Sequence, residues 1–275
     1  MKSIVERILF PRININKDLL VQKLQQKTIV ITGASFGIGE QLCRQLSEID
    51  CQLILVARTT EKLLKIQQEL QDKPAIIYIF SANLGDEAQL DEFISYLKQY
   101  SIDIVINNAG KSICRPIMHS LDRLHDFQRT MQLNYFAPVK LCLALIPQLQ
   151  KNKGHFINIS AVNVLLAPTV YWAAYQASKS AFDQWLRCAE AELLMNDITI
   201  STAYLPLVKT KMIEPTAAYK SMPTMSRQQA ADHICQLMIN HRVYYKPWWA
   251  FLGQIASVIF ATSWLRLTQF YLKKK

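Results

Sequence analysis

Tyr175 and Lys179 stand four positions apart in the segment Y-Q-A-S-K, a spacing that places both side chains on one face of a helix. A phenol with a pKa of about 10 is a poor acid–base group at neutral pH. A neighbouring ammonium favours the phenolate and lowers that pKa. The pair therefore predicts that Tyr175 can donate a proton to a carbonyl oxygen. The same spacing also occurs on exposed helix faces that carry no chemistry, so an exposed pair is the alternative.

A glycine-rich turn supplies the second chemical signal. Residues 32–39 read T-G-A-S-F-G-I-G and follow the apolar run 28–31. Glycines let the backbone turn sharply and approach a phosphate closely. We expect a helix to begin near Gly37, so that its unpaired N–H groups and its dipole point at an anion. A strand, a glycine turn and a helix start together predict a site for a dinucleotide pyrophosphate.

Three other apolar runs end in polar residues. Asn107-Asn108-Ala109-Gly110 closes the run 102–106, Ser160 closes 156–159, and Arg58 closes 53–57. In an open parallel sheet, ligands bind at the carboxyl ends of the strands. An acidic residue at the end of the second strand would favour a free ribose 2′-hydroxyl, whereas the cation Arg58 favours a 2′-phosphate. The alternatives are an ordinary strand-to-turn ending and a surface arginine.

The elements that must position these residues alternate along the chain. Apolar runs of strand length, separated by segments of helical period, predict an α/β fold: a single-domain, doubly wound parallel sheet of Rossmann type with helices on both faces. We expect strands at 28–32, 52–57, 75–80, 102–106, 155–160 and 198–204, and helices at 38–49, 60–71, 86–99, 121–150, 173–195 and 226–240. The expected organisation is an N-terminal extension (1–26) with one short amphipathic helix ended by Pro11, a domain (27–245) and an apolar tail (246–275).

Composition narrows the function classes. The chain has 275 residues and a net charge of +10, but no basic run with interleaved aromatic residues outside the tail, which argues against nucleic-acid binding. The six cysteines are scattered, and no His/Cys cluster has zinc spacing, so no metal site is expected. We expect a cytoplasmic protein in a reducing compartment.

The tail departs from the rest of the chain. The segment 247–265 carries no charge and is flanked by Lys246 and Arg266, and the chain ends in three lysines. Gly253, Gln254 and Ser257 recur on one helical face together with Ala261, which favours a helix lying in a membrane interface. A helix packed on protein and a membrane-spanning helix are the alternatives, because the segment is at the lower limit of spanning length.

Together these motifs resemble the short-chain dehydrogenase/reductase family over roughly residues 27–245. The ordered set is TGxxxGxG (32–39), NNAG (107–110), Asn134, Ser160 and YxxxK (175–179). The resemblance implies that Tyr175 is the acid, that Lys179 also holds the nicotinamide ribose, that Ser160 hydrogen-bonds the substrate carbonyl, and that Asn134 holds a proton-relay water. It implies further that the cofactor, expected to be NADPH, is bound by Gly33, Ser35, Gly37, Ile38, Gly39, Arg58, Asn83, Asn108, Ala109, Gly110 and Thr210.

The chain departs from the family pattern at three places. Members of the family usually carry two serines after this strand, with the second one catalytic, whereas this chain has Ser160-Ala161. An ungapped match places Ala161 at the catalytic position, and a shifted loop places Ser160 there; we favour Ser160, because a carbonyl site without that donor loses a hydrogen bond. Asn83 stands where an acidic residue is usual near the adenine. The usual Pro-Gly after the sixth strand reads Leu205-Pro206-Leu207, and we expect Thr210 still to contact the carboxamide.

Segments 106–117, 121–136 and 204–224 further resemble bacterial short-chain-type fatty acyl-CoA reductases. This implies reduction of a lipophilic carbonyl, a fatty acyl thioester or fatty aldehyde, by a homo-oligomer. Methionine adapts to irregular apolar sites, so Met212, Ile213, Met222 and Met225 are candidate acyl-site residues, and Lys209, Lys211 and Lys220 are candidate partners for CoA phosphates. Core methionines and solvated lysines are the alternatives. The motifs also fit a 3-oxoacyl or hydroxysteroid-type oxidoreductase, and a cofactor-binding regulator without catalysis.

Overall fold

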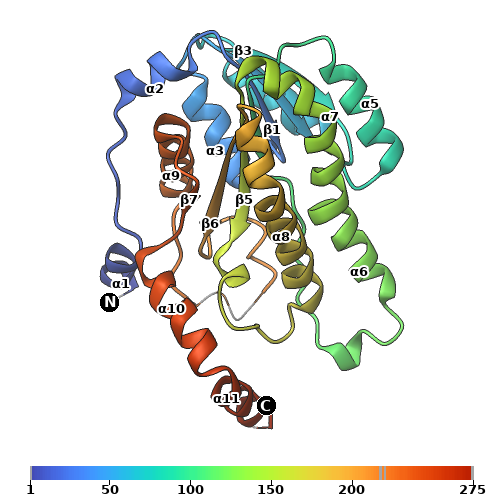
Figure 1. Ribbon diagram of the computed structural model, residues 1–275, viewed down its shortest axis with the longest axis vertical. Helices are drawn as coiled ribbons and strands as arrows, with labels where there is room; N and C mark the ends of the chain where they lie inside the picture. Colours follow the sequence, from blue (N-terminus) through green and yellow to red (C-terminus); the bar gives the residue numbers. More distant parts are fainter. Residues whose placement is uncertain (1, 217–218, 220, 274–275) are drawn as a thin grey trace.

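The structure, a computed structural model, describes residues 2–216, 219 and 221–273. Its centre is a seven-stranded sheet in the order β3-β2-β1-β4-β5-β6-β7, with every neighbouring pair parallel. The predicted doubly wound α/β fold is confirmed (Figure 1). The strands are β1 (Thr28–Thr32), β2 (Gln52–Ala57), β3 (Ile76–Ser81), β4 (Ile104–Asn107), β5 (His155–Ala161), β6 (Thr199–Leu205) and β7 (Tyr244–Tyr245).

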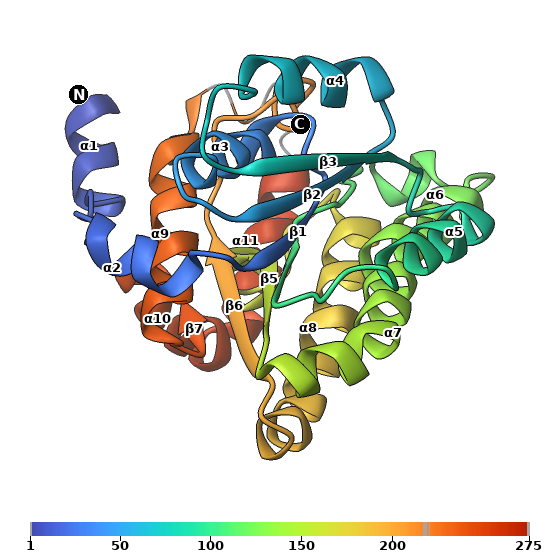
Figure 2. The same ribbon diagram turned by 90° about the horizontal axis from the view of Figure 1, so that it is seen from above.

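Helices cover both faces of the sheet (Figure 2). Alternate residues of each strand point to opposite faces, so Ile157 joins one buried cluster and Phe156 the other. Both faces are buried, which is why the strands read as continuous apolar runs. On one face lie α2 (Lys17–Leu24), α3 (Gly37–Leu46), α4 (Thr60–Glu69) and α9 (Arg227–Asn240); on the other lie α5 (Glu87–Leu97), α7 (Ala137–Asn152) and α8 (Ala173–Met195).

The helix expected at 121–150 is divided. α6 (Leu124–Met131) continues through a π-helical turn, Gln132–Phe136, into α7. The turn carries Asn134, and such turns often occur at functional sites. Two short elements, α2 and β7, have no strong periodic signal in the sequence and form by packing: Leu20 and Leu24 are buried in the core of the domain.

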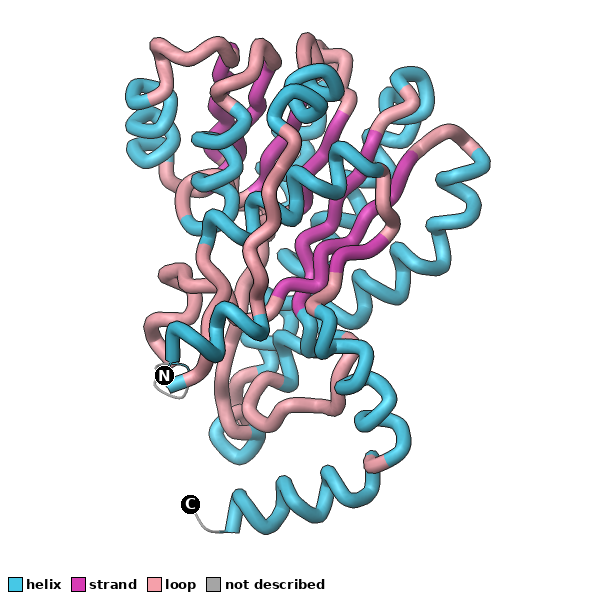
Figure 3. The backbone as a smooth tube through the Cα atoms, turned by 90° about the vertical axis from the view of Figure 1, so that its left-hand side faces the viewer, coloured by secondary structure: helices cyan, strands magenta, loops and turns pink. Residues whose placement is uncertain are grey.

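The N-terminal helix α1 (Lys2–Leu9) ends just before Pro11, as expected. The tail forms two helices rather than one, α10 (Trp248–Ile259) and α11 (Ala261–Lys273). Within the described part of the chain no single helix has the length and apolar character needed to span a membrane; α10 and α11 satisfy that test only as a pair, and they are bent by 91°. Both lie beyond the carboxyl ends of the strands (Figures 1 and 3).

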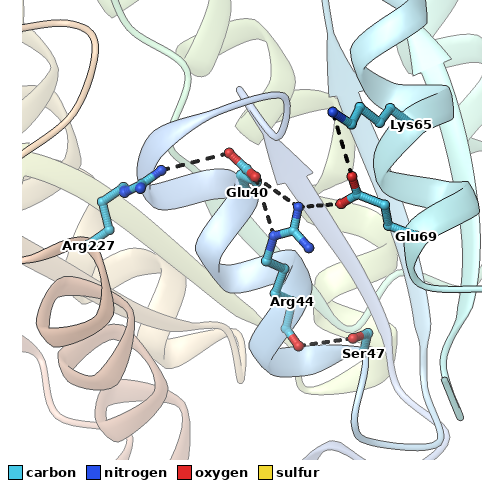
Figure 4. A network of polar contacts seen from close by, with 6 residues as sticks. All are labelled: Glu40, Arg44, Ser47, Lys65, Glu69 and Arg227. Carbon is cyan, nitrogen blue, oxygen red and sulfur yellow. Dashed lines mark hydrogen bonds and ion pairs between the residues drawn. The ribbon is translucent and has the colours of Figure 1, made fainter.

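An ion-pair network fixes the helix that follows the glycine turn (Figure 4). Arg44 of α3 contacts Glu40 at 3.0 Å and Glu69 of α4 at 2.5 Å. Glu40 in turn lies 3.9 Å from Arg227 of α9. Such exposed pairs contribute little stability, about 0–1 kcal/mol each, so the network's main effect is to orient α3 between its two neighbours.

A buried histidine gives the fold a specific acid sensitivity. His155 at the start of β5 is almost fully buried, its Nε2 lies 2.7 Å from Ser201 Oγ, and burial followed by the charge of His241 lowers its pKa to about 3. Ser201 donates its hydroxyl proton to Arg242 O, so Nε2 of His155 must carry the hydrogen that Ser201 accepts. The folded protein therefore accommodates the neutral imidazole ring of His155.

We expect stability to fall as the pH falls below about 6.5. Between the unfolded pKa of 6.5 and the folded value of about 3, the unfolded chain binds one more proton, which costs up to about 1.4 kcal/mol per pH unit. His155→Gln keeps an N–H donor and cannot titrate, so urea unfolding at pH 7 and pH 5 should show a smaller pH dependence. The exposed His119→Gln variant is the control, and equal slopes in all three proteins would contradict the assignment.

Candidate active site

The carboxyl ends of the strands surround a cavity of about 630 Å³, a volume typical of ligand sites. The predicted catalytic and cofactor-binding residues line this cavity, except Gly39 and Asn134, which adjoin the wall residues Gly33 and Gly110. The residues that line it are Gly33, Ser35, Gly37, Ile38, Arg58, Asn83, Asn108, Ala109, Gly110, Ser160, Tyr175, Lys179 and Thr210. The topology thus gathers residues from 33 to 210 at one edge of the sheet.

The glycine turn has the geometry that the sequence predicts. Gly33 and Gly37 have φ of +66° and +68°, which residues with a Cβ rarely adopt. A Cβ on Gly39 would lie 2.4 Å from Gly33 O, so only glycine fits where the helix crosses the turn. α3 begins at Gly37 without a side-chain cap, which leaves its first N–H groups free for an anion. These features fit a dinucleotide phosphate.

Asn108 braces the turn from the neighbouring strand. Its Nδ2 donates to Thr32 O at 2.9 Å and to Gly33 O at 3.1 Å, and its backbone N–H donates to Thr32 Oγ1 at 2.9 Å. The family resemblance places Asn108 among the cofactor-binding residues, and it lines the cavity. Both hydrogens of its side-chain amide are donated to the turn, so Asn108 holds the glycine turn in place, and its contact with the cofactor stays a prediction.

Tyr175 and Lys179 both lie on α8 as expected, but the pKa of Tyr175 shifts in the direction opposite to the prediction. Burial raises the pKa of Tyr175 to about 12 and lowers the pKa of Lys179 to about 8. The predicted lowering of the Tyr175 pKa by Lys179 is therefore wrong for the protein alone. Lys179 Nζ donates to Ile159 O at 2.9 Å, and desolvation of the buried phenol is the cause of its raised pKa. Tyr175 is thus held as the protonated acid at neutral pH.

Ser160 and Ala161 are the two candidates for the place of the family's second serine, and they point in different directions from β5. It follows Phe156 and Asn158 by even steps along β5, so its side chain points to the sheet face that α8 covers, whereas Ala161 points to the other face. Ser160 is 5% exposed, and its Oγ finds no hydrogen-bond partner among the described residues. An unpaired hydroxyl in a cavity wall can accept or donate a hydrogen bond to a ligand.

Asn134 organises the backbone beside Lys179. Its Oδ1 accepts from Lys111 N at 2.9 Å, and its Nδ2 donates to Lys111 O and to Ser178 Oγ, each at 2.9 Å. Both amide hydrogens are therefore occupied by protein. Oδ1 retains one acceptor position. The water-holding role implied by the family resemblance stays a prediction.

The far end of the cavity is electropositive. Arg58 and Lys62 both line it, and Lys62 Nζ lies 5.8 Å from the centre of the Phe36 ring. Burial, followed by the charges of Arg129 and Arg58, lowers the pKa of Lys111 nearby. Lys62 was not identified from the sequence, although its position four residues after Arg58 at the start of α4 is a usable signal. This end suits a phosphate group.

The other end is apolar. Leu166, Trp172, Met212, Ile213 and Met222 line it, as does Tyr219, whose ring centre lies 5.2 Å from that of Trp172. Three further wall residues were missed in the sequence because their partners are distant along the chain: Leu9, Phe10 and Trp249.

Not every residue proposed for an acyl-CoA lies at the cavity. Met225 is fully buried in the core. Its backbone pairs with Leu207 and Lys209, which fixes the end of the segment between β6 and α9. Lys209 and Lys211 are exposed and do not line the cavity, and Lys220 lies outside the described residues. The predictions for Met225, Lys209 and Lys211 are therefore not supported, whereas Met212, Ile213 and Met222 are placed as predicted.

Comparisons with known proteins identify the family of the chain. The family model for short chain dehydrogenases matches residues 27–220. The chain is 40% identical over 246 residues to a fatty acyl-CoA reductase of Acinetobacter baylyi, covering 88% of this chain and 82% of that protein. It is 35% identical over 226 residues to a fatty acyl-CoA reductase of Mycobacterium tuberculosis, covering 81% and 77%.

A solved short-chain dehydrogenase from Sphingobium yanoikuyae in complex with NADPH has the same fold, with a TM-score of 0.74 and 23% identity over 89% of this chain and 95% of that one. Strands β1 to β6, the glycine turn and the Tyr-Lys helix lie within the segment that the family model matches. The chain belongs to the short-chain dehydrogenase family and is an oxidoreductase of that type.

Proposed function

We propose that this protein is an NADPH-dependent reductase of long-chain acyl carbonyls, a fatty acyl thioester or a fatty aldehyde. The observation that carries the proposal is that one cavity is lined both by Tyr175 and Ser160 and by the apolar residues Met212, Ile213 and Met222. The 40% identity to the fatty acyl-CoA reductase of Acinetobacter baylyi supports the same substrate class.

NADPH, when bound, supplies the hydride; the chain supplies positions and protons. The phosphates would lie at Gly33–Gly37 and the start of α3, with the 2′-phosphate beside Arg58. Ser160 Oγ would donate to the substrate carbonyl oxygen, and Tyr175 would protonate that oxygen as negative charge develops. Lys179, with its pKa of about 8 and its bond to Ile159 O, would hold the ribose next to Tyr175.

A thioester requires a second step. Addition of the hydride and of the Tyr175 proton turns the thioester into a hemithioacetal, whose C–S bond breaks as its hydroxyl returns the proton to the Tyr175 phenolate. The products are the aldehyde and the CoA thiolate, which takes one proton from solvent to give the thiol. No cysteine nucleophile is needed, and none of the cysteines lines the cavity in the described chain.

The proposal is tested by following NADPH oxidation with long-chain acyl-CoAs, fatty aldehydes, 3-oxoacyl thioesters and steroid ketones. Turnover of the first two classes, with aldehyde and free thiol formed from the thioester, is the expected result. Turnover confined to 3-oxoacyl thioesters or steroids would overturn the substrate assignment. NADPH binding without turnover of any carbonyl would favour a regulator.

Arg58 tests the choice of cofactor. We expect Arg58→Ala to weaken NADPH binding by about 1.5–3 kcal/mol and NADH binding much less, because only NADPH loses a charge-assisted hydrogen bond. Dissociation constants from fluorescence titration give the comparison. Lys65→Ala, which removes an exposed α4 lysine outside the cavity, is the control. Equal weakening of both nucleotides would show that Arg58 does not bind the phosphate, and a selective loss in Lys62→Ala instead would assign it to α4.

A further inference from the structure

Helix α10 packs with its small and polar residues inward. Ala250 is fully buried, and a Cβ on Gly253 would lie 2.7 Å from a methyl carbon of Leu166. Ser257 Oγ accepts a hydrogen bond of 2.7 Å from Ala167 N. The face that contacts the protein is therefore the one whose residues the sequence grouped as small or polar.

The opposite face of α10 is wholly apolar and faces outward. Val258 is 80% exposed and Ile259 is 66% exposed, and the rest of the face is more than two-fifths exposed. This arrangement inverts the usual surface helix, which turns its apolar stripe to the core. A contiguous apolar surface of this kind marks an interaction site. The face consists of Trp248, Phe251, Leu252, Ile255, Val258 and Ile259.

Helix α1 extends this surface. Trp248 Nε1 donates to Ile8 O at 3.0 Å, so the two helices meet there. Glu6 points inward and accepts from Thr224 N at 3.0 Å, while Ile4 and Ile8, one turn apart, are each about three-fifths exposed. The outward side of α1 is thus a second apolar strip beside that of α10.

The charged residues of the tail, which borders this surface, are all positive. Residues 246–275 contain five cations and no acidic residue. Arg266, Gln269 and Lys273 occupy one side of α11, at i, i+3 and i+7. A symmetric dimer through this face would bring the same cations together, because such an interface places one patch against its own copy. An anionic lipid surface matches both the apolar face and the positive charge.

The geometry favours a helix in the interface over one that crosses the bilayer. α10 has 12 residues and is about 18 Å long, well short of the hydrocarbon thickness of about 30 Å. The bend of 91° then directs α11 across the end of the domain (Figure 3). Trp264 Nε1 of α11 donates to Pro168 O at 3.1 Å, next to the residues that α10 contacts.

We propose that α1 and α10 together form a docking face for anionic lipid bilayers, with the basic helix α11 at its edge, and that the cavity receives its long-chain substrate from that bilayer. The two helices that carry the face also wall the cavity, through Leu9 and Phe10 at the end of α1 and Trp249 of α10. The docking stands on the exposed surface alone. The delivery of substrate rests on the proposed function.

The test is co-sedimentation of the full chain with vesicles of phosphatidylcholine containing phosphatidylglycerol. We expect binding that weakens in 0.5 M salt and with phosphatidylcholine alone. Val258→Glu/Ile259→Glu should lower the partition coefficient about tenfold or more, because two carboxylates replace apolar groups in the interface. The matched control is Leu194→Glu/Met195→Glu, an exposed adjacent pair at the other end of the domain, which should bind as the wild type does. NADPH affinity and circular dichroism report the fold of each variant.

Ile4→Glu/Ile8→Glu tests the contribution of α1, and unchanged binding would overturn its place in the face. A wild-type protein that stays in the supernatant, or equal binding by all variants, would overturn the docking face. So would a dimer in solution that Val258→Glu/Ile259→Glu dissociates without any vesicle binding.

The kinetic arm separates docking from substrate. With a long-chain acyl-CoA in vesicles, Val258→Glu/Ile259→Glu should lose rate about as much as it loses binding, whereas turnover of a short, water-soluble aldehyde should be unchanged. Equal rates with the vesicle-borne substrate would overturn delivery from the bilayer. If no acyl substrate is reduced at all, the proposed function fails while sedimentation still decides the docking face.

Discussion

Tyr175→Phe is expected to lower kcat for carbonyl reduction by about 10²–10⁴-fold while NADPH affinity stays within a few-fold of the wild type. The substitution removes one hydroxyl from a residue whose ring stays in the cavity wall. Burial raises the pKa of that hydroxyl to about 12, so at neutral pH the wild-type group is a protonated donor. Without it, the oxygen that gains negative charge during hydride transfer has no acid beside it.

Stopped-flow measurement of NADPH oxidation under single turnover checks this result, since it isolates the chemical step. Tyr219→Phe is the matched control: Tyr219 lines the same cavity, and its pKa is raised by burial first and then by Tyr175. It should keep nearly full activity. Lys179→Ala should impair both turnover and cofactor binding. A Tyr175→Phe protein with wild-type single-turnover rates would remove Tyr175 from the mechanism.

Ser160→Ala is expected to lower kcat by about 10²–10³-fold, the usual effect of removing one donor from a site where negative charge develops on oxygen. The structure supports Ser160 over Ala161 through strand alternation, which turns Ser160 toward the α8 face, and through its unpaired Oγ within the described chain. The loss should appear in kcat more than in KM, because the hydrogen bond strengthens in the transition state.

A second variant distinguishes whether position 160 or position 161 faces the substrate carbonyl. Ala161→Ser in the Ser160→Ala background should stay inactive, because the new hydroxyl would point to the other face of the sheet. Recovery of activity in that double variant would show that position 161 faces the substrate carbonyl. A wild-type rate in Ser160→Ala alone would show that Ala161 occupies the serine place and that another group supplies the donor. Steady-state kinetics with one aldehyde series suffices for the comparison.

The sequence determined the sheet and most of the cavity because these depend on local rules. Apolar runs alternating with helical periods predict buried parallel strands, and the bounds of β1, β2 and α8 agree with the expected 28–32, 52–57 and 173–195. Gly33, Gly37 and Gly39 read as a phosphate turn because no other residue has the required backbone freedom and size. The carboxyl-end rule then placed Ser160 and Arg58 in the same cavity without knowledge of any contact.

Other features depend on contacts between distant segments, and only the tertiary structure decided them. The tail's composition left membrane contact and packing open. The fold turns Ala250, Gly253 and Trp249 of α10 inward and the other large apolar residues outward, so α10 packs on the domain and still presents an apolar face. Trp249 and Phe10 reach the cavity through docking of α10 and α1. The pKa of Tyr175 rises rather than falls because burial desolvates the phenol, and no spacing in the sequence reports burial.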